Sequence, residues 1–387
     1  MKNTSEFDEI RPYHDEELPE VFELLIEDEA FQNAVGFIVP DIPFSVLAEK
    51  IRACKSKLDF QKAFAYEILR KIAANYTDGL SIDLSANPKE NAYTYISNHR
   101  DIILDAGFLS SLLVDNGLDT VEIAIGDNLL VYPWIKRLVR INKSFIVQRA
   151  LTMRQMLDSS ARMSRYMHYT IKEKKQSIWI AQREGRAKDS DDRTQDSVLK
   201  MLAMGGEGSI TARLANLNII PLSISYEYDP CDYLKAQEFQ LKRDDPNFVK
   251  TTRDDLLNME VGLFGYKGRV HFQTTPCLNN KLEELGEDQS LPKNELFQLI
   301  SQQMDKQIHL GYRMYEVNYV AHDLLYNAET HKKQYTEEQK QGFLSYLDKQ
   351  LGKIQIPNKD EAFLRERILL MYANPLTNHL KALECVD

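Results

Sequence analysis

The chain has 387 residues, of which 43% are hydrophobic and 27% charged, and its formal net charge is −10. A chain of this length and composition can bury a full core in one large domain or two. The acidic balance argues against nucleic acid as a partner, because phosphate binding favours a basic surface. The sequence contains no run of about 18 uncharged apolar residues and no signal-peptide core at its start. We therefore expect a cytoplasmic protein that contacts a membrane only peripherally, on its inner face.

Cysteines and histidines show no metal-ligand spacing. The cysteines are far apart, so we expect reduced thiols rather than a metal or redox motif. These residues are Cys54, Cys231, Cys277 and Cys385. Four histidines are interpreted as structural, namely His168, His271, His309 and His322. The sequence thus predicts no metal site and no cofactor.

Residues 1–80 are predicted to form a helical N-terminal subdomain. Apolar residues recur at helical spacing in 16–27 and again in 44–74. Nothing in this region indicates chemistry.

Residues 81–290 are predicted to form an α/β domain. Short apolar segments indicate strands at 81–84, 93–97, 121–125, 145–147, 177–181, 219–224 and 269–273. Helical patterns lie between most of them, notably at 105–113 and 149–175. Because strands alternate with helices, we expect a mainly parallel sheet flanked by helices.

Residues 291–387 are predicted to form a helical C-terminal extension. The clearest helical patterns are 298–327 and 336–351, and we expect Pro357 and Pro375 to interrupt the tail. The predicted fold class is therefore an α/β domain with helical additions at both ends.

His99 directly follows the predicted strand 93–97. In parallel α/β sheets, ligand sites form at this carboxyl edge. A neutral imidazole there can act as general base on an alcohol when a carboxylate holds its other nitrogen. Asp101 and Asp105 are both close enough in the sequence to supply that carboxylate.

Three more motifs follow at regular distances. They are Gly126-Asp127-Asn128-Leu129 with the segment 144–149 after it, then Glu184-Gly185-Arg186, then the segment from Ile220 to Glu227. In this order, the set resembles the glycerolipid acyltransferases over about residues 90–275. The similarity is greatest to the glycerol-3-phosphate and dihydroxyacetone-phosphate acyltransferase branch.

The resemblance implies an acyl transfer that needs neither metal nor cofactor. Acyl-CoA or acyl carrier protein would supply an acyl thioester, and glycerol-3-phosphate or a lysophospholipid would accept the acyl group. His99 would remove the acceptor's hydroxyl proton. Asp105 would orient His99, because the apolar stretch after Asp105 matches the family's helix, although this chain has one residue more between His and Asp.

The resemblance also assigns residues to the substrates. Arg149 and Arg186, with Lys188 and Arg100, would hold the acceptor's phosphate, which guanidinium groups can bind bidentately. Glu184 and Gly185 would organise their loop, with the carboxylate accepting backbone N–H groups, although the motif is one residue short. Pro221 would begin a strand that lines the acyl site. The alternatives are a surface salt bridge for Arg149, a solvated loop for 184–188, and a core strand for 220–227.

Two weaker patterns concern partners. The segment 129–140 is apolar on one side and carries Lys136, Arg137 and Arg140, so it could lie on an anionic membrane surface or pack as a crossover helix. The basic residues of 165–193 could dock acyl carrier protein or coenzyme A, or form a solvated helix end.

Two other functions compete with catalysis by acyl transfer. His99-Arg100-Asp101 is also typical of protein kinases, but position 106 is Ala and residues 1–90 have no Gly-rich loop. A non-catalytic relative that binds acyl chains or an acyl carrier would explain why this chain has one residue more between His99 and Asp105, and one residue fewer in the Glu184-Gly185-Arg186 motif, than the family pattern. Catalysis predicts that His99 and a carboxylate lie within about 2.6–3.2 Å beside a groove.

Overall fold

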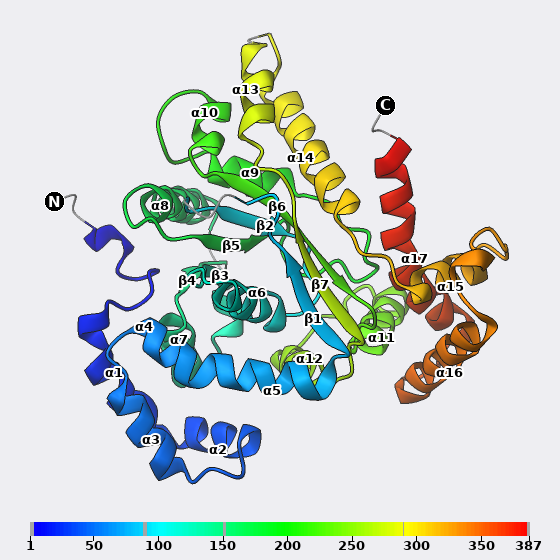
Figure 1. Ribbon diagram of the computed structural model, residues 1–387, viewed down its shortest axis with the longest axis horizontal. Coiled ribbons are helices and arrows are strands. Elements are labelled where there is room, and N and C mark those ends of the chain that lie inside the picture. The colour runs from blue at the N-terminus through cyan, green and yellow to red at the C-terminus, as the bar shows by residue number, and fades with distance from the viewer. Residues whose placement is uncertain (1–3, 88–90, 150–151, 289, 385–387) are drawn as a thin grey trace.

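The computed structural model describes residues 4–87, 91–149, 152–288 and 290–384. Seven strands form one sheet of order β1-β7-β6-β2-β5-β3-β4 (Figure 1). They are β1 (Gly79–Asp83), β2 (Thr94–Ser97), β3 (Glu122–Gly126), β4 (Ser144–Val147), β5 (Ile178–Ala181), β6 (Ile219–Tyr226) and β7 (Arg269–Thr274). All pairs are parallel except β6 with β7. The prediction of a mainly parallel sheet is therefore confirmed.

Helices cover both faces of the sheet, which explains why its central strands are apolar throughout. Every residue of β2 and β6 is buried. One face packs against α8 (Met153–Lys172), α9 (Asp196–Leu202), α10 (Ile210–Ala215), α13 (Asn279–Glu287) and α14 (Lys293–Leu310). The other face packs against α5 (Tyr66–Tyr76) and α6 (Leu104–Asp115).

The N-terminal helices form a small core of their own with α7 (Pro133–Ile141). They are α1 (Leu18–Ile26), α2 (Glu29–Ile38), α3 (Phe44–Ala53) and α4 (Lys57–Phe60), with short 3₁₀ turns at η1 (Ser5–Phe7) and η2 (Asp15–Glu17). A π-helical turn, η3 (Gln61–Ala65), joins α4 to α5. Turns of this kind are rare in proteins, and those that occur are frequently found at functional sites.

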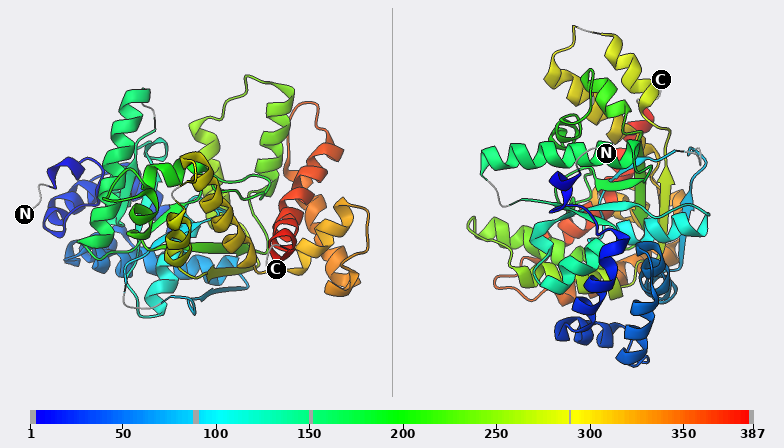
Figure 2. Two further views of the ribbon diagram at one scale, coloured as in Figure 1. Left: turned by 90° about the horizontal axis from the view of Figure 1, so that it is seen from above. Right: turned by 90° about the vertical axis from the view of Figure 1, so that its left-hand side faces the viewer.

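A third core lies at the opposite end of the molecule from the N-terminal helices (Figures 1 and 2). It is built by α11 (Asp232–Asp244), α15 (Glu316–Leu325), α16 (Glu337–Lys353) and α17 (Glu361–Glu384), with η5 (Lys332–Gln334) between α15 and α16. Two helical extensions thus flank the sheet. The limits at residues 80 and 290 stay a prediction.

Two expectations about the C-terminal region were wrong. Pro375 lies inside α17 and does not end it, because α17 packs against α11, α14 and α15, whose contacts outweigh the lost backbone hydrogen bond. The helical pattern of 298–327 is divided between α14 and α15. At the break, Gly311 comes so close to β6 that an added Cβ would lie 2.4 Å from the Ser223 hydroxyl.

Cys54, Cys231 and Cys277 are free thiols, and Cys385 lies outside the described residues. Within the portion of the chain that the structure describes, no helix is both long and apolar enough to cross a membrane.

Candidate active site

His99 and Asp105 meet where β2 ends and α6 begins. The Nδ1 atom of His99 lies 2.8 Å from Oδ2 of Asp105. Because an ionised carboxylate can only accept, Nδ1 carries the hydrogen and Nε2 is left as the basic nitrogen. The His99 side chain is 14% exposed and lines a large cleft, whereas Asp105 is fully buried.

The end of β2 is held rigidly. The side chain of Asn98 accepts from the N–H of Ile224 (2.8 Å) and donates to its carbonyl (2.9 Å), which fixes this end to β6. Trp179 on β5 packs its ring edge-to-face with His99 at 5.6 Å and donates to the hydroxyl of Ser97. Sequence reasoning missed both Asn98 and Trp179, because neither residue type by itself indicates a positioning role.

One oxygen of Asp105 accepts three hydrogen bonds. Besides His99, Oδ2 receives the backbone N–H groups of Arg100 (2.6 Å) and Asp101 (3.1 Å). The other oxygen, Oδ1, and the hydroxyl of Tyr226 are both buried without a hydrogen-bond partner among the described residues. Burial, followed by the charge of Asp105, raises the pKa of Tyr226 well above its ordinary value, so this phenol stays protonated. Asp105 is thus fixed by its surroundings and not by a cation.

Asp101 has a different role in the same turn. Its Oδ1 accepts the N–H groups of Ile103 (2.9 Å) and Leu104 (2.7 Å) and so caps the first turn of α6. Burial, followed by the charge of Asp105, raises the pKa of Asp101. Gly262 on α12 (Thr252–Phe264) packs directly on this carboxylate. The carboxylate that pairs with His99 is therefore Asp105 and not Asp101.

The cleft beside His99 has a volume of ≈ 1480 Å³. Its lining comes from both faces of the sheet at the carboxyl edge, from η3, α5, α6 and α7, and from α12. All five residues of η3 take part. Most of the wall is apolar, and its arginines follow the ends of β4 and β5.

Arg149 lies at the end of β4 and lines the cleft. Its guanidinium forms an ion pair with Glu184 at 3.3 Å, and its backbone N–H donates to Asp127 in the turn η4 (Asp127–Leu129). Gly126 makes room for it, because an added Cβ would lie 2.7 Å from Nε of Arg149. The expectation that the Glu184 carboxylate accepts backbone N–H groups is not met. The carboxylate is exposed and pairs with Arg149 instead.

Two further arginines of the loop after β5 reach into the cleft. Arg186 donates to the side-chain oxygen of Asn258 (2.8 Å), while its other terminal nitrogen, Nη1, is buried without a hydrogen-bond partner among the described residues. Arg183 also lines the cleft, with a buried and unpartnered Nε. Gly185 between them has φ +67°, which glycine adopts without strain. Sequence reasoning missed Arg183, which precedes the matching motif.

Two other predicted substrate residues have partners elsewhere. Arg100 is buried in an ion pair with Asp192 at 2.7 Å, does not line the cleft, and has a raised pKa because the charge of Asp192 outweighs burial. Lys188 lines the cleft but pairs with Glu238.

Pro221 is the third residue of β6 and not its first, and it does not line the cleft. The missing N–H is tolerated because the pairing with β7 starts one residue later, at Leu222.

Both weaker patterns are partly occupied by contacts within the protein. In α7, Ile141 is buried and Trp134 and Leu138 pack on the N-terminal core, whereas Lys136, and Tyr132 just before the helix, stay exposed. Arg140 donates to the backbone carbonyls of Asp8 and Arg11. Four of the eight basic residues of 165–193 are paired with carboxylates, including Arg165 with Glu6.

Residues 82–225 match the family model described as Acyltransferase. No curated protein matches the chain. Among solved structures, the chain is similar to the 1-acyl-sn-glycerophosphate (LPA) acyltransferase PlsC from Thermotoga maritima, with a TM-score of 0.36 and 10% identity over 76% of this chain and 95% of that chain. The family model spans the segment from β1 to β6, including His99, Asp105 and the three cleft arginines. The matched segment is 144 of the 387 residues of the chain.

Proposed function

We propose that the protein transfers a fatty acyl group from an acyl thioester to a hydroxyl of glycerol-3-phosphate or a lysophospholipid-type acceptor, in phospholipid synthesis. The observation that carries the proposal is the 2.8 Å contact between His99 and the buried Asp105 in the wall of a large apolar cleft. General-base catalysis needs this geometry, and a protein that only binds acyl chains does not.

In the proposed reaction, Nε2 of His99 takes the proton of the acceptor hydroxyl as its oxygen attacks the thioester carbonyl. The carbon–sulfur bond then breaks, and the imidazolium returns its proton to the leaving thiolate. Asp105 stabilises the transient imidazolium and keeps Nε2 free of hydrogen. No covalent acyl-enzyme is required.

The charged part of the cleft suits the acceptor. Arg149, Arg183 and Arg186 line it from the ends of β4 and β5, which lie on either side of β3. Nη1 of Arg186 has no hydrogen-bond partner in the described part of the chain. A buried, unpartnered guanidinium nitrogen favours an anionic ligand, and a phosphate can accept several such donors. The ion pair between Arg149 and Glu184 would open when phosphate binds.

The apolar part of the cleft suits the acyl chain. Its walls include residues of α5, α6, η3 and α7. The chain would run from His99 along α6, with its thioester at the carboxyl edge of the sheet.

The deciding experiment incubates purified protein with acyl-CoA or acyl carrier protein thioesters and with glycerol-3-phosphate or lysophosphatidate, in all four pairings. Thiol release is followed together with the lipid product by mass spectrometry. The proposal predicts thiol release that depends on an acceptor and equals product formed. Binding of a fluorescent fatty acid without turnover in any pairing would contradict it and favour the non-catalytic alternative.

We further propose that the protein takes its lipid substrate from a membrane surface. Phe37, Tyr132 and Met156 are exposed apolar residues on the rim of the cleft. Phe37→Glu is expected to weaken co-sedimentation with anionic vesicles, whereas Leu383→Glu, an exposed position on α17 far from the cleft, is the matched control. Equal losses in both variants would refute this docking surface.

A further inference from the structure

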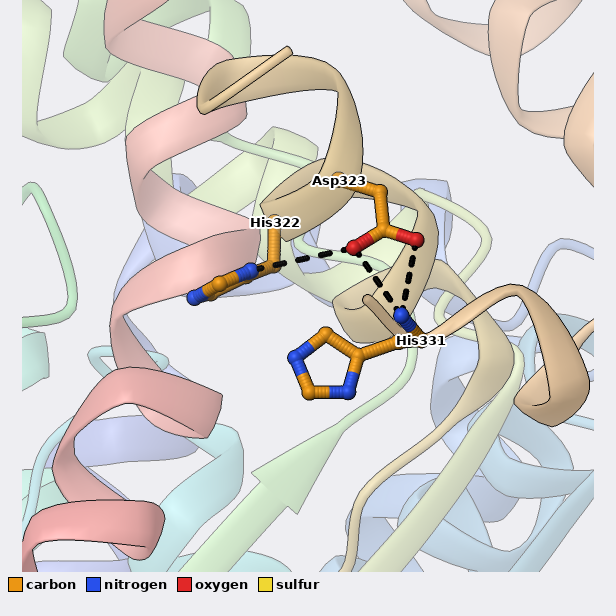
Figure 3. Close-up of side chains that lie close together, drawn as sticks. All are labelled: His322, Asp323 and His331. Atoms are coloured by element: carbon orange, nitrogen blue, oxygen red, sulfur yellow. Dashed lines mark hydrogen bonds and ion pairs between the residues drawn. The ribbon is translucent and has the colours of Figure 1, made fainter. Parts of the chain in front are cut away.

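The end of α15 and the turn after it bring His322, Asp323 and His331 together (Figure 3). None of the three lines the cleft beside His99. Their candidate ligand atoms all lie within 4.8 Å of one another. The two imidazole rings are 4.8 Å apart at 82°, and Nδ1 of His322 lies 4.0 Å from Oδ1 of Asp323. Sequence spacing did not indicate this group, because eight residues lie between the two histidines.

Two buried ring nitrogens in this group have no hydrogen-bond partner among the residues that the structure describes. They are Nδ1 of His322 and Nε2 of His331. Figure 3 shows both rings on the same side of the Asp323 carboxylate, with these two nitrogens on the sides that face the group. Buried polar atoms are normally satisfied, so a pair of orphaned acceptors facing one carboxylate calls for a ligand.

The carboxylate is held in place but not neutralised. Asp323 accepts the backbone N–H of His331 (3.0 Å) and the hydroxyl of Tyr335 (2.9 Å). In the described ranges, no lysine or arginine forms an ion pair with it. Neutral donors that orient a ligating carboxylate are typical of the outer shell of metal sites.

We propose that His322, Asp323 and His331 bind a divalent transition-metal ion of the zinc type. Two imidazoles with one carboxylate suit such ions, whereas magnesium and calcium prefer oxygen ligands only. Three protein ligands leave a fourth position for water. Both histidines are only partly buried, so water can reach that position.

Binding requires a small contraction. In a tetrahedral zinc site with bonds of about 2.0–2.1 Å, ligand atoms lie about 3.3–3.4 Å apart. The group would therefore close by roughly an ångström, which rotation of the two imidazole side chains can supply. The ion would tie the turn after α15 to the helix itself, so its role would be structural and independent of acyl transfer.

The test uses the full-length protein, stripped with a chelator and titrated with Zn²⁺ by calorimetry. We expect one Zn²⁺ per chain, and a rise in melting temperature with Zn²⁺, because an ion that binds only the folded state stabilises it. His331→Gln should lose both effects. His14→Ala, which removes an exposed histidine outside the group, should keep them.

A second measurement guards against misfolding of the variant. Co²⁺ added to the stripped wild-type protein should give the visible bands of a tetrahedral nitrogen–oxygen site, and Zn²⁺ should displace them. Absence of Zn²⁺ binding in the wild type, or undiminished binding in a folded His331→Gln protein, would overturn the proposal and would leave the acyltransferase proposal untouched.

Discussion

Replacing Asp105 by Asn separates the charge of this residue from its shape. Oδ2 accepts three donors, while Oδ1 has no hydrogen-bond partner among the described residues. An asparagine can therefore take the same shape in only one orientation of its amide. Its oxygen would take the Oδ2 position, because the backbone N–H groups of Arg100 and Asp101 need an acceptor there and would repel the NH₂ group. Nδ1 of His99 would keep its hydrogen and Nε2 its basicity, so that only the negative charge is lost.

The expected cost follows from the geometry. Two unit charges about 4 Å apart interact by about 4 kcal/mol at an effective dielectric constant of about 20. Loss of this stabilisation of the imidazolium should lower kcat by about 10³-fold, since each 1.36 kcal/mol is about tenfold. Stability should hardly fall, because the substitution also removes a buried charge that no cation neutralises.

The assay is steady-state thiol release with the best donor and acceptor pair, together with thermal unfolding. Asp115→Asn, at the exposed far end of the same helix, is the matched control and should keep kcat near that of the wild type. If Asp105→Asn keeps kcat within about threefold of the wild type, the imidazolium stabilisation assigned here does not exist.

Three further substitutions test the surroundings of the site. Arg149→Ala should raise the KM for the acceptor and leave the KM for the donor nearly unchanged, and an unchanged acceptor KM would remove Arg149 from the phosphate site. Gly262→Ala should lower the free energy of unfolding by about 1–3 kcal/mol, because its Cβ would lie 2.1 Å from Oδ2 of Asp101. The control Gly36→Ala, in a helix with open space around it, should raise that free energy, and a loss of equal size there would refute the explanation. Burial lowers the pKa of Lys267 to about 8, whereas its ordinary value is 10.5, so between these two pH values the folded protein binds fewer protons than the unfolded chain. The free energy of unfolding of the wild type, measured relative to that of Lys267→Met, should therefore rise from about pH 8 to 10.5. A difference that is flat across this range in urea titrations would contradict the assignment.

The fold was largely predictable from local pattern. All seven strands were predicted within a few residues, because each is a short apolar segment bounded by turns or helices. The exceptions have tertiary causes. Pro375 is retained within α17 by packing on three helices, and the break at Gly311 follows from its approach to β6. The sequence around Pro375 does not reveal the helices that pack on α17, and the sequence around Gly311 does not reveal its contact with β6.

The location of the site was predictable from the sequence, but the ion-pair partners of its charged residues were less so. Parallel strands bring His99, Arg149 and Arg186 to one edge, as the order of motifs implies. Sequence cannot reveal which charges neutralise one another across long separations, such as Arg100 with Asp192 or Lys188 with Glu238.

The central claim is that His99 removes the acceptor's proton. The most direct measurement compares acceptor-dependent thiol release by the wild type and by His99→Ala, with thermal unfolding of both. We expect the variant to lose nearly all transfer while its melting temperature stays close to that of the wild type, since His99 lies at the cleft surface. Transfer that continues in a folded His99→Ala protein at a rate comparable to the wild type would contradict the account.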